Sequence, residues 1–145
     1  MATKLIMSAT DGSEGAERAV LAAAGLAKAL NAKLLIVHVS EDVFSNKELR
    51  LLDQLRVAEG DALEELSRRI LARAEAFAKT HGALNVETMT GGGDPAKVLI
   101  ETVEREHADA IVVGRRGRGR LEGLLLGSVS QKLSCLAPCM VIVVP

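Results

Sequence analysis

Residues 114–133 combine the densest positive charge of the sequence with a glycine-rich backbone. This stretch, GRRGRGRLEGLLLGSVSQKL, holds five glycines, and four arginines fall within six residues at its start. Glycine lets backbone N–H groups approach an anion with no Cβ in the way. The N-terminus of a following helix adds N–H donors and the positive end of its dipole, and the hydroxyls of Ser128 and Ser130 can add hydrogen bonds. These residue types favour the binding of phosphate groups, although a run of arginines is more often a solvated face.

A second polar segment, from Thr10 to Ser13, follows the apolar residues 5–9. The carboxylate of Asp11 is better suited to holding Mg²⁺ than to abstracting a proton. The same residue type is common in Asx turns, where it accepts a backbone hydrogen bond from two residues further on. The sequence leaves both interpretations of Asp11 open.

Better-known nucleotide and catalytic motifs are missing from the sequence. No glycine segment has the spacing of a P-loop or of a G-x-G-x-x-G dinucleotide site, and there is no G-x-S-x-G elbow. The three histidines have no metal-ligand spacing, and His38 is expected to be a satisfied core or crevice residue. Cys135 and Cys139 are expected to be small buried side chains. We therefore predict a binding protein rather than an enzyme, with slow hydrolysis of a bound nucleotide left open.

The composition excludes several classes of partner. The net charge is −1 and the only aromatic residues are Phe44 and Phe77, so no nucleic-acid partner is expected. The apolar runs are too short to span a membrane, and the N-terminus does not resemble a signal peptide. We expect one domain over residues 1–145, with no membrane partner and a cytoplasmic location.

Apolar strands alternate with amphipathic helices along the chain. Five segments are typical of buried strands, and four intervening segments carry apolar residues at steps of three and four. This order predicts a parallel sheet with helices on both faces. If the first and fourth strands are neighbours, the two segments described above meet at the edge where open parallel sheets bind ligands. The expected strands are residues 5–9, 32–39, 84–90, 108–114 and 139–145, and the expected helices are residues 14–30, 61–80, 95–107 and 128–136.

Local signals predict where several helices begin and end. Ser13 and Asp94 are expected N-caps, and Gly82 is an expected C-terminal cap. Asp61 followed by Glu64 is similar to a capping box and predicts a helix start there, whereas residues 41–60 give the least clear pattern. The residues expected on the buried face of the helix over 61–80 are Leu63, Leu66, Ile70, Ala74 and Phe77.

The last apolar segment, CMVIVV at residues 139–144, carries no charge. Left as a free sheet edge, such a strand is a template for aggregation. Pairing with the same strand of a second copy would satisfy its backbone and give a two-fold interface. We expect a homodimer through this strand, unless a loop covers the edge.

The glycine spacing of the opening stretch resembles the ATP-binding signature of the universal stress protein family. Two residues separate Gly114 from Gly117, and a further nine residues separate Gly117 from Gly127 and Ser128. The segments SATDGSEGAERAV, VHVSED, GDPAKVLIETVEREHADAIVVGRRGRG and GSVSQKLSCLAPCMVIVVP are similar to further parts of the family. The resemblance covers nearly the whole chain and is weakest over residues 41–60.

This resemblance implies a fold, a ligand and a site. The fold is a single-domain, flavodoxin-like or Rossmann-like α/β fold with an open five-stranded parallel sheet of order 3-2-1-4-5, assembled as a homodimer. The ligand in one branch of the family is ATP, here with Mg²⁺ or Mn²⁺ at Asp11, which would make the protein a nucleotide-dependent sensor or regulator in the stress response. The alternative is a dimeric interaction module without a working nucleotide site. The residues implied at the site are Ala9, Thr10, Asp11, Val39, Gly114, Arg115, Gly117, Arg118, Gly127, Ser128, Val129 and Ser130.

Overall fold

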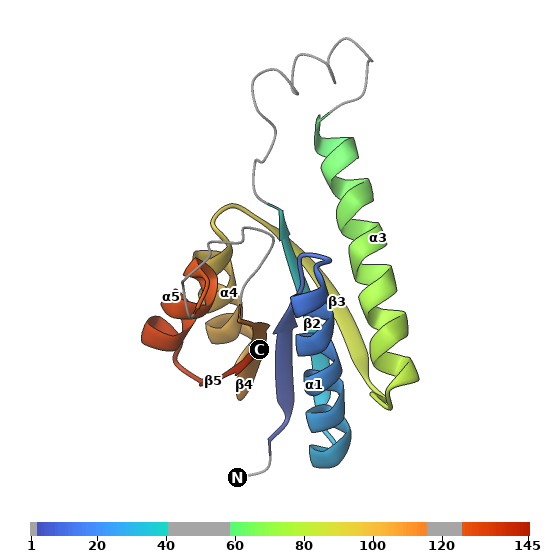
Figure 1. Ribbon diagram of the computed structural model, residues 1–145, viewed down its shortest axis with the longest axis vertical. Helices are drawn as coiled ribbons and strands as arrows, with labels where there is room; N and C mark the ends of the chain where they lie inside the picture. Colours follow the sequence, from blue (N-terminus) through green and yellow to red (C-terminus); the bar gives the residue numbers. More distant parts are fainter. Residues whose placement is uncertain (1–2, 41–58, 116–125) are drawn as a thin grey trace.

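The computed structural model describes residues 3–40, 59–115 and 126–145, which form one parallel sheet with helices on both faces (Figure 1). The strand order is β3-β2-β1-β4-β5, and every pair of neighbouring strands is parallel. This architecture confirms the fold expected from the sequence. The elements are β1 (Leu5–Ala9), α1 (Glu14–Leu30), β2 (Lys33–Ser40), α3 (Glu59–Thr80), β3 (Val86–Gly92), α4 (Pro95–Glu106), β4 (Ala110–Gly114), α5 (Ser128–Leu136) and β5 (Met140–Val144).

The hydrophobic core consists of two layers, one on each face of the sheet. Successive side chains of a strand point to opposite faces, so Ile6 of β1 belongs to the cluster under α1 and α3, and Met7 belongs to the cluster under α4 and α5. The first cluster is rich in alanine from α1, which allows this helix to pack closely on the sheet. Strands buried on both faces explain the continuous apolar runs in the sequence.

Three of the predicted helix caps are confirmed. The hydroxyl of Ser13 accepts the N–H of Ala16 at 3.2 Å, and the carboxylate of Asp94 accepts the N–H of Lys97 at 3.0 Å. Gly82 has φ +99° directly after α3, a conformation that favours glycine at the end of a helix.

The expected start of α3 is wrong, and its expected buried face is correct only in part: Ala74 is buried and Phe77 packs against the core, but other positions differ. The helix begins at Glu59, so Asp61 lies inside its first turn, where the helix dipole favours an acidic residue, and does not cap it. Leu66 is 43% exposed, because the buried stripe is rotated by one position and includes a polar residue, Ser67. The Ser67 hydroxyl lies 2.8 Å from Nδ1 of His38 on β2, and both side chains are buried. The buried residues of α3 are Ser67, Leu71, Ala74 and Ala78.

The third strand also differs from its expected range. β3 begins at Val86 and includes Gly91 and Gly92, which the sequence pattern assigned to a loop. A Cβ on Gly91 would lie 2.7 Å from Cγ1 of Val98, so the strand requires a glycine there to pass under α4. The other element boundaries lie within two residues of their expected positions.

Candidate functional site

The carboxyl ends of β1 and β4 lie side by side at the centre of the sheet. Ile6 pairs with Ala110 and Ser8 pairs with Val112, while β2 flanks β1 on one side and β5 flanks β4 on the other. The winding direction of the sheet therefore reverses between β1 and β4, which is the position where open parallel sheets bind ligands. We call this position the β1–β4 edge.

The loop after β1 is held by its own side chains. The N–H of Thr10 donates to the Val37 carbonyl at 2.9 Å, and the Thr10 hydroxyl accepts the N–H of Gly12 at 3.2 Å. Oδ1 of Asp11 accepts the N–H of Ser13 at 2.9 Å, which confirms the Asx-turn interpretation. A carboxylate has lone pairs for about four hydrogen bonds or metal contacts, so this turn is compatible with a ligand role for Asp11.

Gly114, the last residue of β4, lies between the first turns of two helices. A Cβ at this position would lie 2.9 Å from the Gly15 carbonyl oxygen in α1. On the other side, the Ser130 hydroxyl of α5 donates to the Gly114 carbonyl at 2.7 Å. Gly114 therefore joins the start of α1, which follows the Asp11 turn, to the start of α5.

Arg115 and Gly127, which lie apart in the sequence, are joined by a backbone hydrogen bond at the start of α5. The Arg115 N–H donates to the Val144 carbonyl at 2.7 Å, and the Arg115 carbonyl accepts the N–H of Gly127 at 2.7 Å and the Ser130 hydroxyl at 3.2 Å. Ser130 is only 3% exposed, and its hydroxyl also lies 2.7 Å from the Gly114 carbonyl. The hydroxyl therefore holds Arg115 and Gly114 beside the start of α5, and the expectation that it also contributes to a phosphate site stays a prediction.

The N-terminus of α5 offers backbone donors at the β1–β4 edge. Gly127 is the N-cap and contributes no capping side chain, and the first intrahelical hydrogen bond runs from Gln131 N–H to the Gly127 carbonyl at 3.0 Å. The N–H groups of Ser128, Val129 and Ser130 precede that bond, and the first turn contains no acidic residue. This end of α5 is therefore an electropositive helix terminus of the kind that binds anions.

The apolar residues expected at the site share one face of the sheet. Ala9, Val39 and Val129 all pack against the core cluster under α4 and α5. Together with the Asp11 turn and Gly114, the structure thus gathers residues from β1, β2, β4 and α5 around the β1–β4 edge. Gly117 and Arg118, which the family signature includes, lie outside the described residues.

The histidine and cysteine candidates have structural surroundings and do not form a metal site among the described residues. His38 is 6% exposed and hydrogen-bonded, as expected, but Cys135 is exposed because the buried positions of α5 are Ser130 and Leu133. Burial raises the pKa of the half-buried Cys139 thiol. Within residues 3–40, 59–115 and 126–145, no cluster of three His, Cys, Asp or Glu side chains could hold a metal ion. Nor does any helix in these ranges have the length and apolar character needed to cross a membrane.

The role of Gly15 in shaping the site was not predicted from the sequence. Gly15 lies in the first turn of α1 and accommodates the close approach of Gly114. Glycine is an unfavourable residue within a helix, so its presence there was the available signal of a close backbone contact.

Comparison with known proteins agrees with this architecture. The profile of the Universal stress protein family matches residues 2–145. A relative from Thermus aquaticus, named as a universal stress protein in the QAH/OAS sulfhydrylase 3′ region, is 39% identical and covers 97% of this chain and 98% of its own. A universal stress protein solved in complex with cAMP has 29% identity and a TM-score of 0.73 over 99% of this chain and 98% of that one. UspA from Lactobacillus plantarum, at 24% identity, supports the fold with a TM-score of 0.83 over 100% of this chain and 99% of that one.

The chain therefore belongs to the universal stress protein family.

Proposed function

We propose that this protein binds an adenine nucleotide, ATP with Mg²⁺, at the β1–β4 edge and acts as a nucleotide-dependent regulator in the stress response. The observation that carries the proposal is the position of Gly114, which brings the Asp11 turn and the electropositive end of α5 to the same edge of the sheet. The solved relative that is in complex with cAMP supports an adenine nucleotide as the ligand.

Each part of the nucleotide is assigned to a part of the site. The N–H groups at the start of α5 would receive the phosphates, Asp11 would face the ribose or the metal-bound phosphate, and Ala9 and Val39 would lie beside adenine. Charge-assisted hydrogen bonds contribute about 1.5–3 kcal/mol each, so about three or four of them suffice for micromolar affinity after an association cost of about 4 kcal/mol. Gly117, Arg115 and Arg118 complete the proposed site.

The residues at the edge fit a Mg²⁺ ion that the nucleotide itself brings. Mg²⁺ is usually held by one or two carboxylates together with substrate phosphates and waters, rather than by a cage of protein ligands. Asp11 is the carboxylate of the loop at this edge, and Oδ1 already orients the side chain by accepting the N–H of Ser13. The proposed metal would therefore join Asp11 to the phosphates and would not bind tightly without them.

We further propose a homodimer through β5. This strand is the last in the sheet order, and its residues are half-buried or, in the case of Met140, 65% exposed. An uncharged edge strand of this kind is satisfied when it pairs with a second copy.

Purification under non-denaturing conditions followed by mass spectrometry of the released ligand tests the proposal. Calorimetric titration with Mg-ATP, and separately with cAMP, then distinguishes the two ligands. We expect an adenine nucleotide in the purified protein and micromolar affinity for Mg-ATP, both abolished by Gly117→Val. A folded protein with no copurified nucleotide and no heat of binding would contradict the proposal and favour an interaction module.

A further inference from the structure

A cleft lies between α1 and α3, on the other face of the sheet from Val39 and Val129. Its volume is about 240 Å³, below the range of about 300–1,000 Å³ that holds drug-sized ligands, so only a small molecule fits. Val20, Ala74 and Phe77 line its apolar part and belong to the core cluster under α1 and α3. Val39 and Val129 pack in the opposite cluster. The apolar part of the cleft therefore lies on the other face of the sheet from the proposed adenine position, and the turn containing Thr10 and Gly12 borders both.

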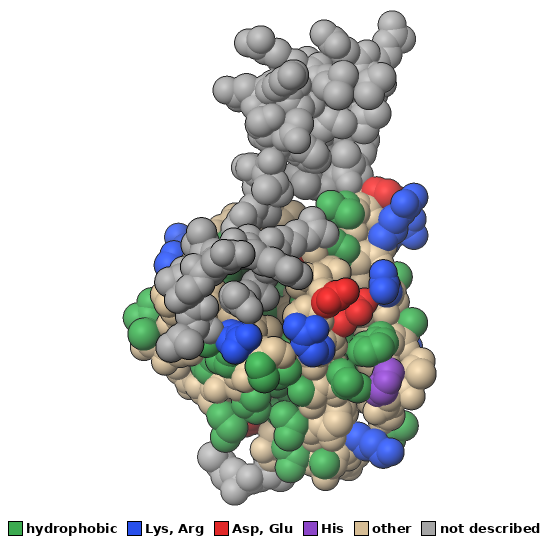
Figure 2. All heavy atoms as spheres, viewed as in Figure 1, with side chains coloured by type: hydrophobic (Ala, Val, Ile, Leu, Met, Phe, Trp, Pro, Cys, Tyr) green, Lys and Arg blue, Asp and Glu red, His purple; other side chains and the backbone are tan. Residues whose placement is uncertain are grey.

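Charged side chains from both helices line the same cleft. Arg69 and Arg73 are one turn apart on α3, and Glu17 reaches toward them from α1, with its Oε1 2.9 Å from Nη2 of Arg73. Figure 2 shows basic and acidic side chains gathered beside apolar ones over these two helices. Glu65 also pairs with Arg69, and with Arg68 outside the cleft, so three guanidinium groups and two carboxylates leave one excess positive charge, which favours a ligand with one negative charge.

The ion pairs of the two arginines are of the kind that a ligand can replace. The side chains of Arg69 and Arg73 are 76% and 78% exposed, and exposed pairs contribute only about 0–1 kcal/mol. Guanidinium groups bind carboxylates through two parallel hydrogen bonds, which is stronger and more specific than a single contact. The exchange of Glu17 for a ligand carboxylate therefore costs little.

We propose that the α1–α3 cleft binds a small monocarboxylate with a compact apolar body. The apolar body would lie against Val20, Ala74 and Phe77, and the carboxylate would meet Arg69 and Arg73. This ligand site is additional to the nucleotide site and does not depend on it.

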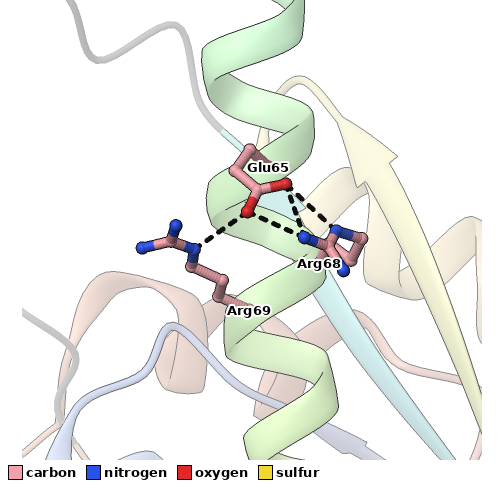
Figure 3. A network of polar contacts seen from close by, with 3 residues as sticks. All are labelled: Glu65, Arg68 and Arg69. Atoms are coloured by element: carbon pink, nitrogen blue, oxygen red, sulfur yellow. Dashed lines mark hydrogen bonds and ion pairs between the residues drawn. The ribbon is translucent and has the colours of Figure 1, made fainter.

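The chain offers a matched control for the arginines. Arg68 and Arg69 both bind Glu65, with nitrogen to Oε1 distances of 2.8 Å and 2.9 Å. The two side chains extend from different sides of α3 (Figure 3). Arg68 is 71% exposed and does not line the cleft, so Arg68→Ala removes a similar charge and ion pair while every residue that lines the cleft is kept.

Titration of the full chain with phenylacetate, followed by ¹H–¹⁵N NMR in the absence of nucleotide, tests the proposal. We expect saturable shifts of the amide signals of Val20, Arg73 and Ala74 below about 10 mM, and much weaker shifts with the neutral phenylacetamide. The double variant Arg69→Ala/Arg73→Ala should weaken binding about 10-fold or more. Arg68→Ala should leave the affinity within about twofold.

A variant that is expected to bind phenylacetate more tightly distinguishes a loss of ligand contacts from a general loss of structure. Glu17→Gln removes the carboxylate that competes for Arg73, so phenylacetate should bind about threefold more tightly. Absence of saturable shifts at the cleft, equal loss in Arg68→Ala, or unchanged affinity in the double variant would each overturn the proposal. Because no nucleotide is present, these results are independent of whether ATP binds.

Discussion

At the scale of single residues, Asp11 and Gly114 each have a structural contact that can be separated from a ligand role. Asp11 closes an Asx turn, and Gly114 accommodates the backbone of α1. Substitutions that keep one role and remove the other therefore show which residues contribute to nucleotide binding directly.

Asp11→Asn keeps an oxygen that can accept the Ser13 N–H but removes the negative charge. We expect its free energy of unfolding to stay within about 0.5 kcal/mol of the wild type, since asparagine also forms Asx turns. Its affinity for Mg-ATP should fall about 10-fold because the carboxylate ligand of the metal is lost. Urea denaturation and calorimetry measure the two quantities. Asp11→Ala is the control that loses the turn as well, and Mg-ATP affinity equal to the wild type in Asp11→Asn would exclude the metal role.

Gly114→Ala introduces a Cβ at 2.9 Å from a backbone oxygen of Gly15, a contact that neither side can easily relieve. We expect destabilisation of about 1–3 kcal/mol, typical of overpacking. The matched control is Gly25→Ala in α1, the helix that contains Gly15, since a Cβ there would meet nothing within 4 Å. That variant should be more stable by about 0.5–1 kcal/mol, because glycine is unfavourable inside a helix. Equal thermal stability of the two variants would disprove the close contact.

At the scale of elements, Asp109 fastens the start of β1 to the start of β4. Its Oδ2 accepts the N–H groups of Lys4 and Leu5 at 2.8 Å and 2.9 Å, and these hydrogen bonds lower the pKa of the carboxyl below its usual value of 3.8. A group whose pKa is depressed in the folded state stabilises the fold above the unfolded pKa, and this contribution is lost as the pH falls through the folded pKa.

Asp109→Asn should therefore reduce stability at neutral pH and make it less dependent on pH in acid. Urea denaturation between about pH 2 and pH 7 gives the free energy of unfolding of both proteins. We expect the difference between them to shrink below about pH 4, where the unfolded wild-type chain begins to bind a proton at Asp109, until the pH falls below the lowered pKa of the folded carboxyl. A constant difference across the whole range would show that the carboxylate charge does not support this junction.

The sequence predicted the elements better than their faces. Ser13, Asp94 and Gly82 act through local backbone geometry, so their caps could be read directly from residue types. The buried stripe of α3 could not, because it depends on the pairing of Ser67 with His38 on a strand that lies far away in the sequence.

The parts of the candidate site that depend on local sequence could be predicted, and those that depend on tertiary packing could not. The glycines and the Asp11 turn follow from local spacing, and the strand order places them at one edge. The hydrogen bonds of Ser130 to Gly114 and Arg115 depend on tertiary packing, so residue types and spacing do not reveal them.

At the scale of the whole molecule, the exposed edge of β5 determines the proposed assembly. Met140 N–H and the Val144 carbonyl face β4, so the alternate residue Val143 directs its backbone groups to the outer edge. Val143→Pro should therefore remove a hydrogen-bond donor from the dimer interface while sparing the β4–β5 pairing.

We expect Val143→Pro to be a folded monomer, whereas Val143→Thr, which keeps the N–H and the β-branched shape, should remain dimeric. Light scattering coupled to size-exclusion chromatography measures the mass, and circular dichroism checks the fold. A dimer in both variants would place the interface elsewhere.

The central claim is that the start of α5 and the Asp11 turn form one nucleotide site. A ¹H–¹⁵N NMR titration of the full chain with Mg-ATP tests it most directly, because it reports on the individual backbone amides. We predict the largest shifts at Ser128, Val129 and Gly12, with saturation at micromolar affinity. Saturable shifts confined to other surfaces, or no shifts at all in a folded nucleotide-free sample, would contradict the account.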